Sequence, residues 1–340
     1  MYYRRKQFKN TCLRQLLPAT PIAFIVLALS VMPGENALLG RGVCLKVQAQ
    51  QPLNDAAQKI ELRQLNDEFK SKLRAKEYYK AEKLARKMLD QWPGMTIPYQ
   101  SMGEVKKAQR IYSEALKYFT QALSKSGDKC EVLIDRADLY KLMDEDALVL
   151  ADCRLALTTK NIRASQCLHL AQMLAAIDSP LECIAACDKG LALRSDNFNL
   201  LRLKATNLSS LKRFGEAEIV LRKILKENPQ DDKSLRELAF VQSYMKKYAE
   251  AIVNFDALIK LGREREVRQL EVLQERAQCH FALGHYDKSI DDLSACIKMY
   301  PLNRYLYSRR AEVYLKQGNV AKAKADQAKL NEFDRSFKPL

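Results

Sequence analysis

The sequence predicts an all-α solenoid of stacked helical hairpins. A 34-residue period begins near Leu62 and runs almost to the end of the 340-residue chain, and glycine and proline are sparse, at 11 and 10 residues. Position 8 of the repeating unit holds Phe69, Gly103, Ala137, Ala171, Ala205, Ala239, Ala277 and Ala311, and position 20 holds Ala81, Ala115, Val149, Cys183, Ala217, Ala251, Ser289 and Ala323. A period of this length is typical of supersecondary units that bury their apolar faces only against their neighbours.

The composition bounds the class of protein further. Hydrophobic residues make up 47% of the chain, which argues against disorder for most of it. The net charge is +16, and removing residues 1–49, with seven basic residues and one acidic residue, leaves +10. This excess favours anionic partners, although a solvated helical exterior with scattered charge accounts for it equally simply.

Residues 1–49 have the features of a targeting segment. Basic residues lead the chain (Arg4, Arg5, Lys6, Lys9 and Arg14), and an apolar run of 11 residues follows at 22–32. That run is short for a bilayer span and suits the core of a signal peptide. Compact residues at Val47 and Ala49 predict cleavage after Ala49, so that the mature chain starts at Gln50. The alternative is an uncleaved membrane anchor followed by a neck.

The rest of the chain is expected to be a short linker or cap followed by eight repeats. The cap covers residues 50–61, and the units cover 62–95, 96–129, 130–163, 164–197, 198–231, 232–265, 270–303 and 304–337. In the first helix of each unit the apolar residues are spaced three and four apart, as in an amphipathic helix. In most units the second helix opens with an aromatic residue: Tyr78, Tyr112, Phe214, Tyr248 and Tyr286. Pro93, Pro229 and Pro301 then end it.

Three places depart from the repeat. At Pro180 the second helix lacks its aromatic residue, and Ser179 with Glu182 predicts a capping box there. Four residues are inserted between the sixth and seventh units, within the charged run 263–268. The last unit carries the polar Gln327 where earlier units have Phe119, Leu221 or Phe255, as expected for a terminal repeat with a wetter outer face.

Taken together, the alanines at positions 8 and 20, the aromatic residues that open the second helices and the closing prolines resemble the tetratricopeptide repeat (TPR) family over residues 62–337. The tryptophan that the family has in its first helix is absent from every unit. The resemblance implies a right-handed superhelix whose concave groove is lined by the first helices and binds a peptide or protein. The asparagine pattern that such repeats use to clamp a chaperone tail is missing, so that ligand is not expected.

Residue types for catalysis are not arranged in any known motif. The chain has three histidines (His169, His280 and His285) without a metal-binding spacing, no phosphate-binding glycine loop and no nucleophile elbow. We therefore expect no enzyme activity, no cofactor and no metal. After cleavage seven cysteines remain, mostly at positions that elsewhere hold buried residues, and we expect buried free thiols rather than disulfides.

The resemblance places a partner-binding groove on the outward positions of the first helices. In the middle of the chain these are Asn199, Arg202, Thr206, Lys233, Arg236 and Phe240. Two guanidinium groups and one ammonium group predict a site for a carboxylate-bearing segment. Ordinary surface charge explains the same residues without a ligand. Towards the N-terminus, Asp67, Asp135 and Asp138 make the groove more acidic.

These observations favour an exported, non-enzymatic scaffold that binds a protein or peptide, including an acidic one, in the cell envelope or outside the cell. Nucleic-acid binding is an alternative because the chain is basic, but the signal-like N-terminus and the 34-residue period argue against it. A regulatory subunit of a separate enzyme is a third interpretation that the sequence does not separate from the first.

Overall fold

The computed structural model describes the backbone of residues 41–336, except 126, 128 and 263–265. The described residues divide into two units, one ending at Lys59 and the other beginning at Ile60. The predicted apolar run at 22–32 lies outside the described residues. Among the described residues no helix is long and apolar enough to cross a membrane.

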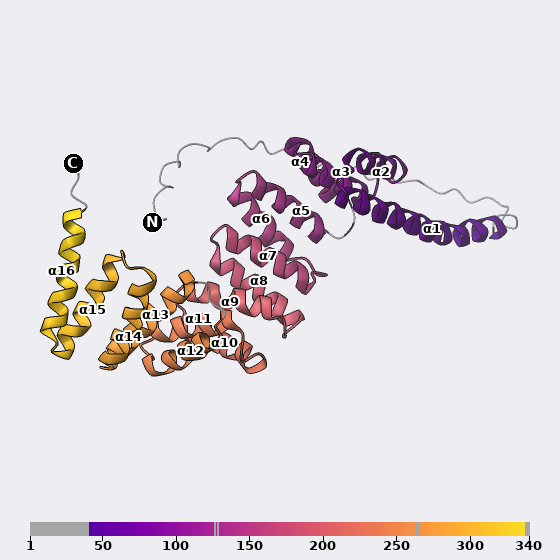
Figure 1. The fold of residues 1–340 in the computed structure, drawn as a ribbon. Helices are drawn as coiled ribbons and strands as arrows, with labels where there is room; N and C mark the ends of the chain where they lie inside the picture. The colour runs from indigo at the N-terminus through magenta and orange to yellow at the C-terminus, as the bar shows by residue number, and fades with distance from the viewer. Residues whose placement is uncertain (1–40, 126, 128, 263–265, 337–340) are drawn as a thin grey trace, which may run out of the picture. The chain divides into compact units, whose positions relative to one another are not determined.

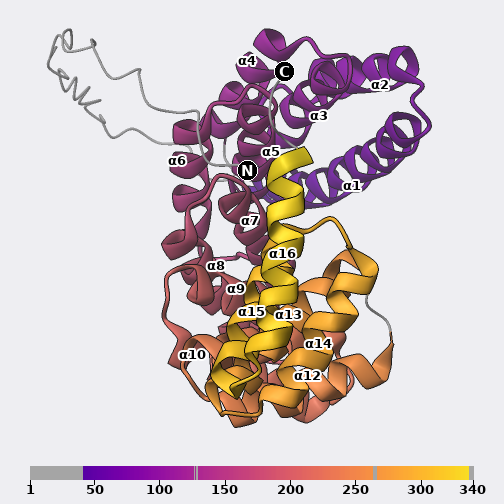
Figure 2. The same cartoon turned by 60° about the vertical axis from the view of Figure 1, so that its left-hand side comes forward.

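The described residues form sixteen α-helices and no strand (Figure 1). They are α1 (Arg41–Arg74), α2 (Tyr78–Gln91), α3 (Thr96–Ala108), α4 (Tyr112–Ser124), α5 (Lys129–Leu142), α6 (Asp146–Leu157), α7 (Ala164–Ala176), α8 (Pro180–Leu193), α9 (Phe198–Ser210), α10 (Phe214–Glu227), α11 (Asp232–Tyr244), α12 (Tyr248–Leu261), α13 (Glu266–Ala282), α14 (Tyr286–Met299), α15 (Arg304–Gln317) and α16 (Val320–Ser336). From α3 onwards the two helices of each pair pack together, and each pair packs on the next (Figure 2). The predicted all-α solenoid is confirmed. The division into a targeting segment, a cap and eight units stays a prediction.

The small residues at positions 8 and 20 lie where the two helices of a pair approach each other. All sixteen are buried, and two pairs touch directly: Cys183 Sγ lies 3.2 Å from the carbonyl oxygen of Ala171, and Ser289 Oγ donates to that of Ala277 at 2.9 Å. A Cβ on Gly103 would lie 2.6 Å from the Phe119 ring. The absence of bulk at these positions therefore allows the helices to pack closely.

The turn inside each pair places one residue in the left-handed conformation. Glycine fills this place only at Gly284 and Gly318, with φ of 75° and 85°. Six side-chain-bearing residues fill it elsewhere: Lys76, Arg110, Asp144, Asp178, Lys212 and Lys246. The next residue donates its backbone N–H back to the helix, as Lys247 does to the carbonyl of Gln242 at 2.8 Å. This hydrogen bond offsets part of the roughly 1–2 kcal/mol that the conformation costs a residue with a Cβ.

Three arginines at position 7 of their units, Arg136, Arg276 and Arg310, each join their own pair of helices to the preceding pair. Arg276 on α13 donates Nε and Nη2 to Asp292 on α14, at 2.9 and 2.5 Å, and its Nη1 reaches Asp256 on α12 at 2.6 Å. Arg136 and Arg310 make equivalent bidentate bonds to Asp152 and Asp326. Each guanidinium thus closes its own pair and contacts the preceding one.

The predicted capping box at the start of α8 is wrong. Ser179 makes no side-chain hydrogen bond to the helix, because the left-handed Asp178 before it leaves its backbone at φ −113° and ψ 71°. Glu182 instead accepts a hydrogen bond from Arg154 on α6. Pro180 does occupy the first turn as expected. At the other end of the array, Gln327 is exposed, while Ala323, Leu330 and Phe333 on α16 are buried.

Adding bulk at position 8 should separate the helices of a pair. Ala239, on α11, is fully buried against Ala251 and Phe255 of α12. We expect Ala239→Leu to lower the free energy of unfolding by about 1–3 kcal/mol through overpacking, measured by urea-induced unfolding. Ala151→Leu, at an exposed mid-helix site on α6, is the matched control and should stay within about 0.5 kcal/mol of wild type. Equal midpoints for the two variants would contradict this account of the packing.

Candidate functional site

The residues predicted to bind a partner lie on two adjacent first helices, α9 and α11. The two helices are bridged across this face by Thr206 Oγ1, which donates to Glu237 Oε2 at 3.0 Å, and by Ser209 Oγ, which donates to Glu237 Oε1 at 3.3 Å. Asn199 and Lys233, at position 2 of their units, are exposed. We call the residues at positions 2, 5, 6 and 9 of the first helices the groove face.

Arg202 has a partner within the chain that the sequence analysis did not include. Its Nη2 lies 3.0 Å from Asp231 Oδ1 and 3.3 Å from Oδ2. Asp231 also caps α11, because its Oδ2 accepts from the backbone N–H of Ser234 at 3.0 Å. Burial acts against the charge of this carboxylate, yet the bonds from Ser234 and Arg202 lower the pKa of Asp231. Arg202 Nε is buried without a hydrogen-bond partner among the described residues.

Phe240 and Arg236 complete the predicted set on α11. Phe240 is half-buried and meets Phe255 edge to face, with ring centroids 5.5 Å apart. Its ring therefore contributes to the packing of α11 on α12 as well as to the groove face. Arg236 is half-buried, and its charge opposes only part of the rise that burial causes in the pKa of its neighbour Glu237.

The sequence analysis missed two equivalent carboxylates on this face. Glu237 on α11 and Glu275 on α13 both occupy position 6 of their units. Each accepts a hydrogen bond from a serine of the preceding first helix, since Ser243 Oγ lies 3.3 Å from Glu275 Oε2 just as Ser209 does from Glu237. Burial raises the pKa of both carboxyl groups despite these bonds. The groove face is thus of mixed charge rather than uniformly basic.

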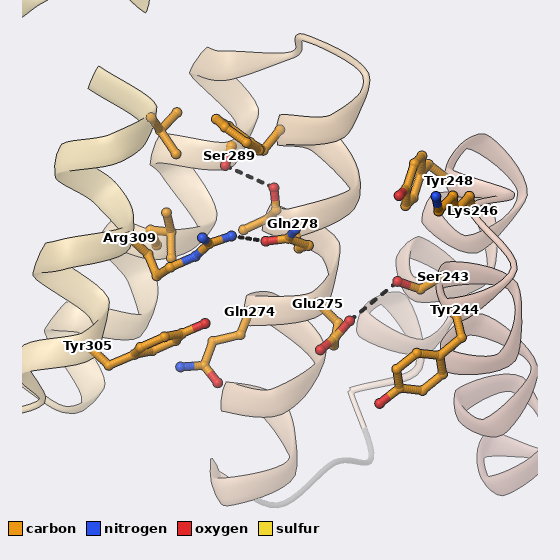
Figure 3. A pocket seen from close by; sticks show the side chains of 14 residues that line it. Ser243, Tyr244, Lys246, Tyr248, Gln274, Glu275, Gln278, Ser289, Tyr305 and Arg309 are labelled. Carbon is orange, nitrogen blue, oxygen red and sulfur yellow. Dashed lines mark hydrogen bonds between the residues drawn. The ribbon is translucent and has the colours of Figure 1, made fainter. Parts of the chain in front are cut away.

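The same face continues into a cavity between α11, α13 and α15 (Figure 3). Its volume is about 520 Å³, and it is lined by Ser243, Tyr244, Lys246, Tyr248, Gln274, Glu275, Ala277, Gln278, Phe281, Ser289, Leu293, Tyr305, Arg309 and Val313. Arg309 donates a hydrogen bond to Gln278 across the cavity. The Tyr244 and Tyr305 side chains are 62% and 58% exposed. Aromatic rings that are both rigid and accessible are typical anchors of protein interfaces.

Three residues that line this cavity occupy the same positions of their units as groove residues that the sequence analysis named in the fifth unit. Tyr305 stands at position 2, Gln274 at position 5 and Gln278 at position 9 of their units, which are the positions of Asn199, Arg202 and Thr206. Gln274 and Gln278 are one helical turn apart and offer amide donors and acceptors. Extending the same mapping from α11 to α15 would have found them.

The groups that usually perform chemistry are buried or scattered. Among the described residues, no three His, Cys, Asp or Glu side chains are grouped to hold a metal ion. His280 is 5% exposed, and desolvation lowers its pKa. The seven cysteines from Cys130 to Cys296 are buried and unbridged. Burial and the neighbouring Asp152 raise the pKa of Cys153 to about 12.

The pKa of Glu237 is raised and that of Glu218 is lowered, so the two glutamates together test the electrostatics of buried carboxylates in the array. Because the folded pKa of Glu237 lies above the ordinary 4.5, stability is expected to fall as pH rises from 4.5 through that raised pKa, when the carboxylate must ionise in a buried site. Glu237→Gln should remove this loss. The measurement is the unfolding midpoint across the acid-to-neutral range.

Glu218 is the matched control for this titration. Burial opposes its ionisation, but bonds from Lys247 at 2.7 Å, Arg222 at 2.8 Å and Gln242 at 3.1 Å lower the pKa of Glu218 to about 2. Its stabilisation is present above pH 4.5 and is lost as pH falls towards 2. Glu218→Gln should therefore be less stable than wild type at neutral pH, and the same pH profile for both variants would refute the assignment.

Comparison with known proteins supports the repeat. Residues 270–301 match the model of the tetratricopeptide repeat. Hsp70-Hsp90 organizing protein 3 of Arabidopsis thaliana is 23% identical over 214 residues, 62% of this chain and 38% of that protein. U-box domain-containing protein 70 of Oryza sativa subsp. japonica is 28% identical over 218 residues, again 62% of this chain but 26% of the relative. The chain thus spans less than two fifths of these relatives.

The solved structures agree in fold. The C-terminal part of a TPR repeat-containing protein from Cytophaga hutchinsonii superposes with a TM-score of 0.54 at 15% identity, covering 69% of this chain and 95% of that one. The match at residues 270–301, the buried and mostly small residues at positions 8 and 20, and the pairwise stacking of α3–α16 agree with one another. Residues 270–301 are thus a tetratricopeptide repeat within a helical-repeat solenoid that resembles tetratricopeptide repeat proteins, and repeats of this kind indicate a protein-protein interaction scaffold.

Proposed function

We propose that the protein is a non-enzymatic scaffold that binds an extended or helical segment of a protein partner on the groove face from α9 to α15. The observation that carries this proposal is the 520 Å³ cavity at the α11–α13–α15 end, which combines two exposed tyrosines with amide side chains. The first helices present it in register with the basic positions of α9 and α11. A groove of this kind suits a segment whose side chains alternate between anchoring in the cavity and facing solvent.

The chemistry of the cavity favours a peptide over a small metabolite. Gln274 and Gln278 offer both donors and acceptors one turn apart, which suits the alternating N–H and C=O groups of a peptide backbone. Tyr244 and Tyr305 flank these amides and are accessible for packing against an apolar or aromatic side chain (Figure 3). Burying such a ring in the centre of an interface is a common source of affinity.

An acidic group of the partner is proposed to lie beside Lys233. This lysine is exposed and has no ion pair among the described residues, whereas Arg202 is already bound to Asp231. Glu237 on α11 and Glu275 on α13 reduce the positive potential of the surrounding face, so the proposed contact is local. A charge-assisted bond to one carboxylate, rather than a general polyanion site, fits this distribution.

We also propose that the protein works outside the cytoplasm, in the periplasm, outside the cell or anchored at the membrane. The support is the basic lead and the apolar run at 22–32, whose length and flanks suit a signal peptide. The non-enzymatic role is supported by the absence of a catalytic motif from the sequence and by the inaccessible state of the described thiols and of His280.

The groove proposal is tested by affinity capture from the native host. We expect Tyr244→Ala combined with Tyr305→Ala to reduce recovery of the specific partner by about tenfold or more, since interface anchors of this type often contribute over 1.4 kcal/mol. Tyr79→Ala is the matched control, because Tyr79 on the second helix α2 is 82% exposed and lies off the groove face. Equal recovery with wild type, the double variant and the control would reject the groove.

Export is tested by the N-terminus of the protein recovered from its host. If the signal is cleaved, mass spectrometry should find a chain starting at Gln50, and Ala49→Arg should leave it uncut because a large charged side chain does not fit a peptidase site for small residues. If the segment remains as an anchor, the full-length chain should sediment with the membranes. Recovery of the uncut wild-type chain in the soluble cytoplasmic fraction would exclude both forms of the proposal.

A further inference from the structure

A second cavity on the groove face lies nearer the N-terminus, between α5 and α7. Its volume is about 240 Å³, and it is lined by Glu131, Ile134, Asp135, Asp138, Arg163, Ser165, Gln166 and His169. We call it the acidic cavity. Glu131, Asp135 and Asp138 are spaced four and three residues apart on α5, so one face of that helix presents all three carboxylates.

The acidic cavity holds more carboxylate than the chain neutralises. Burial and the charge of Asp135 raise the pKa of Glu104, on α3, to about 7. Burial raises the pKa of Asp135 to about 6. The charges of Glu131 and Asp138 add to this rise, and Lys107 and the hydrogen bond from Gln100 oppose it. Gln100 Nε2 lies 2.6 Å from Asp135 Oδ2. Neither carboxylate has an ion pair within 4.0 Å among the described residues.

The cations around this cavity are engaged elsewhere or too distant to balance it. His169 Nε2 lies 3.1 Å from both oxygens of Asp138, and this bond raises the pKa of His169. Arg163 lies 3.9 Å from Glu131 and is largely exposed. Lys107 acts on Glu104 and Asp135, and Lys70 acts on Glu104, only through longer-range attraction.

Gln166 provides an independent sign that a ligand belongs in this cavity. Its side chain is 7% exposed, its Oε1 accepts from the backbone N–H of Arg163 at 3.0 Å, and its Nε2 has no hydrogen-bond partner among the described residues. A buried donor left unpaired costs about 1–3 kcal/mol, so such groups are usually satisfied by water, an ion or a ligand. Nε2 requires an acceptor, such as a peptide carbonyl.

We propose that the acidic cavity binds a basic side chain of the partner, a guanidinium or an ammonium group, with the cation beside Asp135 and the carbonyl of the same peptide residue accepting from Gln166 Nε2. This inference rests on the proposed function, in which the groove face holds a peptide segment. A cation at this place would neutralise carboxylates that the protein leaves unpaired, and a peptide carbonyl would satisfy the amide. A metal ion explains these features less well, since the described carboxylates and histidine are not grouped to coordinate one.

The test is an NMR titration of the full chain with three blocked single-residue peptides. N-acetyl-arginine methylamide and N-acetyl-lysine methylamide carry the cation, and N-acetyl-citrulline methylamide keeps the shape of arginine without its charge. We expect the two cationic probes to give saturable shifts at the Gln166 side-chain amide and in α5, and citrulline to bind at least fivefold more weakly. Asp135→Asn should weaken the cationic probes by about tenfold, as loss of one partner of a buried charge pair does.

Asp67→Asn is the matched control, because Asp67 occupies position 6 of its unit, as Asp135 does, but is exposed. It should leave binding unchanged, and circular dichroism checks that both variants fold. Equal binding of arginine and citrulline, equal effects of the two variants, or no saturable shift would overturn the inference. The readout is independent of the partner captured through Tyr244 and Tyr305, so each proposal can fail while the other stands.

Discussion

The architecture depends on how closely the two helices of each pair can approach. The mostly small residues at positions 8 and 20 set that distance: a Cβ on Gly103 would collide with the Phe119 ring, and the carbonyls of Ala171 and Ala277 lie against Cys183 and Ser289. When the crossing is tight, the larger apolar residues on either side interdigitate and form the core. The array is therefore a sequence of local contacts, each repeated with small changes, rather than one central core.

Polar side chains connect each pair of helices to the next, outside the apolar contact within the pair. Arg276 and Arg310 each bind an aspartate of their own pair and a side chain of the preceding one. Glu218 does the same on a second helix, where it receives bonds from both Gln242 and Lys247 of the following unit. Because these contacts use buried, hydrogen-bonded charges, removing one partner leaves the other charge buried and unpaired, which destabilises the fold. The contacts also leave the outward positions of the first helices available for binding.

Sequence reasoning recovered the fold because its signal is local and periodic. The second helices begin at Tyr78, Tyr112, Phe214, Tyr248 and Tyr286, the aromatic residues named from the pattern. The bridge from Arg202 to Asp231 was missed because the aspartate lies 29 residues further on, in the turn before α11, outside the positions that the groove was mapped from. Ser179 failed as a cap because its backbone angles are set by the turn before it, which propensity alone does not describe. Unpaired buried groups such as Gln166 Nε2 depend on three-dimensional neighbours and carry no sequence signal.

The reactivity of the buried thiols would report when the helices around them separate. A thiol reacts as the thiolate, and burial together with Asp152 or Asp292 raises the pKa of Cys153 and Cys296 to about 12. Modification of either sulfur therefore requires its helix pair to separate. Five of the seven cysteines lie in α5–α8 and two in α13–α14, so alkylation rates would compare the two regions within one molecule. In an oxidising compartment, a local opening that brings two of Cys153, Cys183 and Cys187 together in solvent would let them form a disulfide. That bond would hold the opened arrangement after the fluctuation had passed.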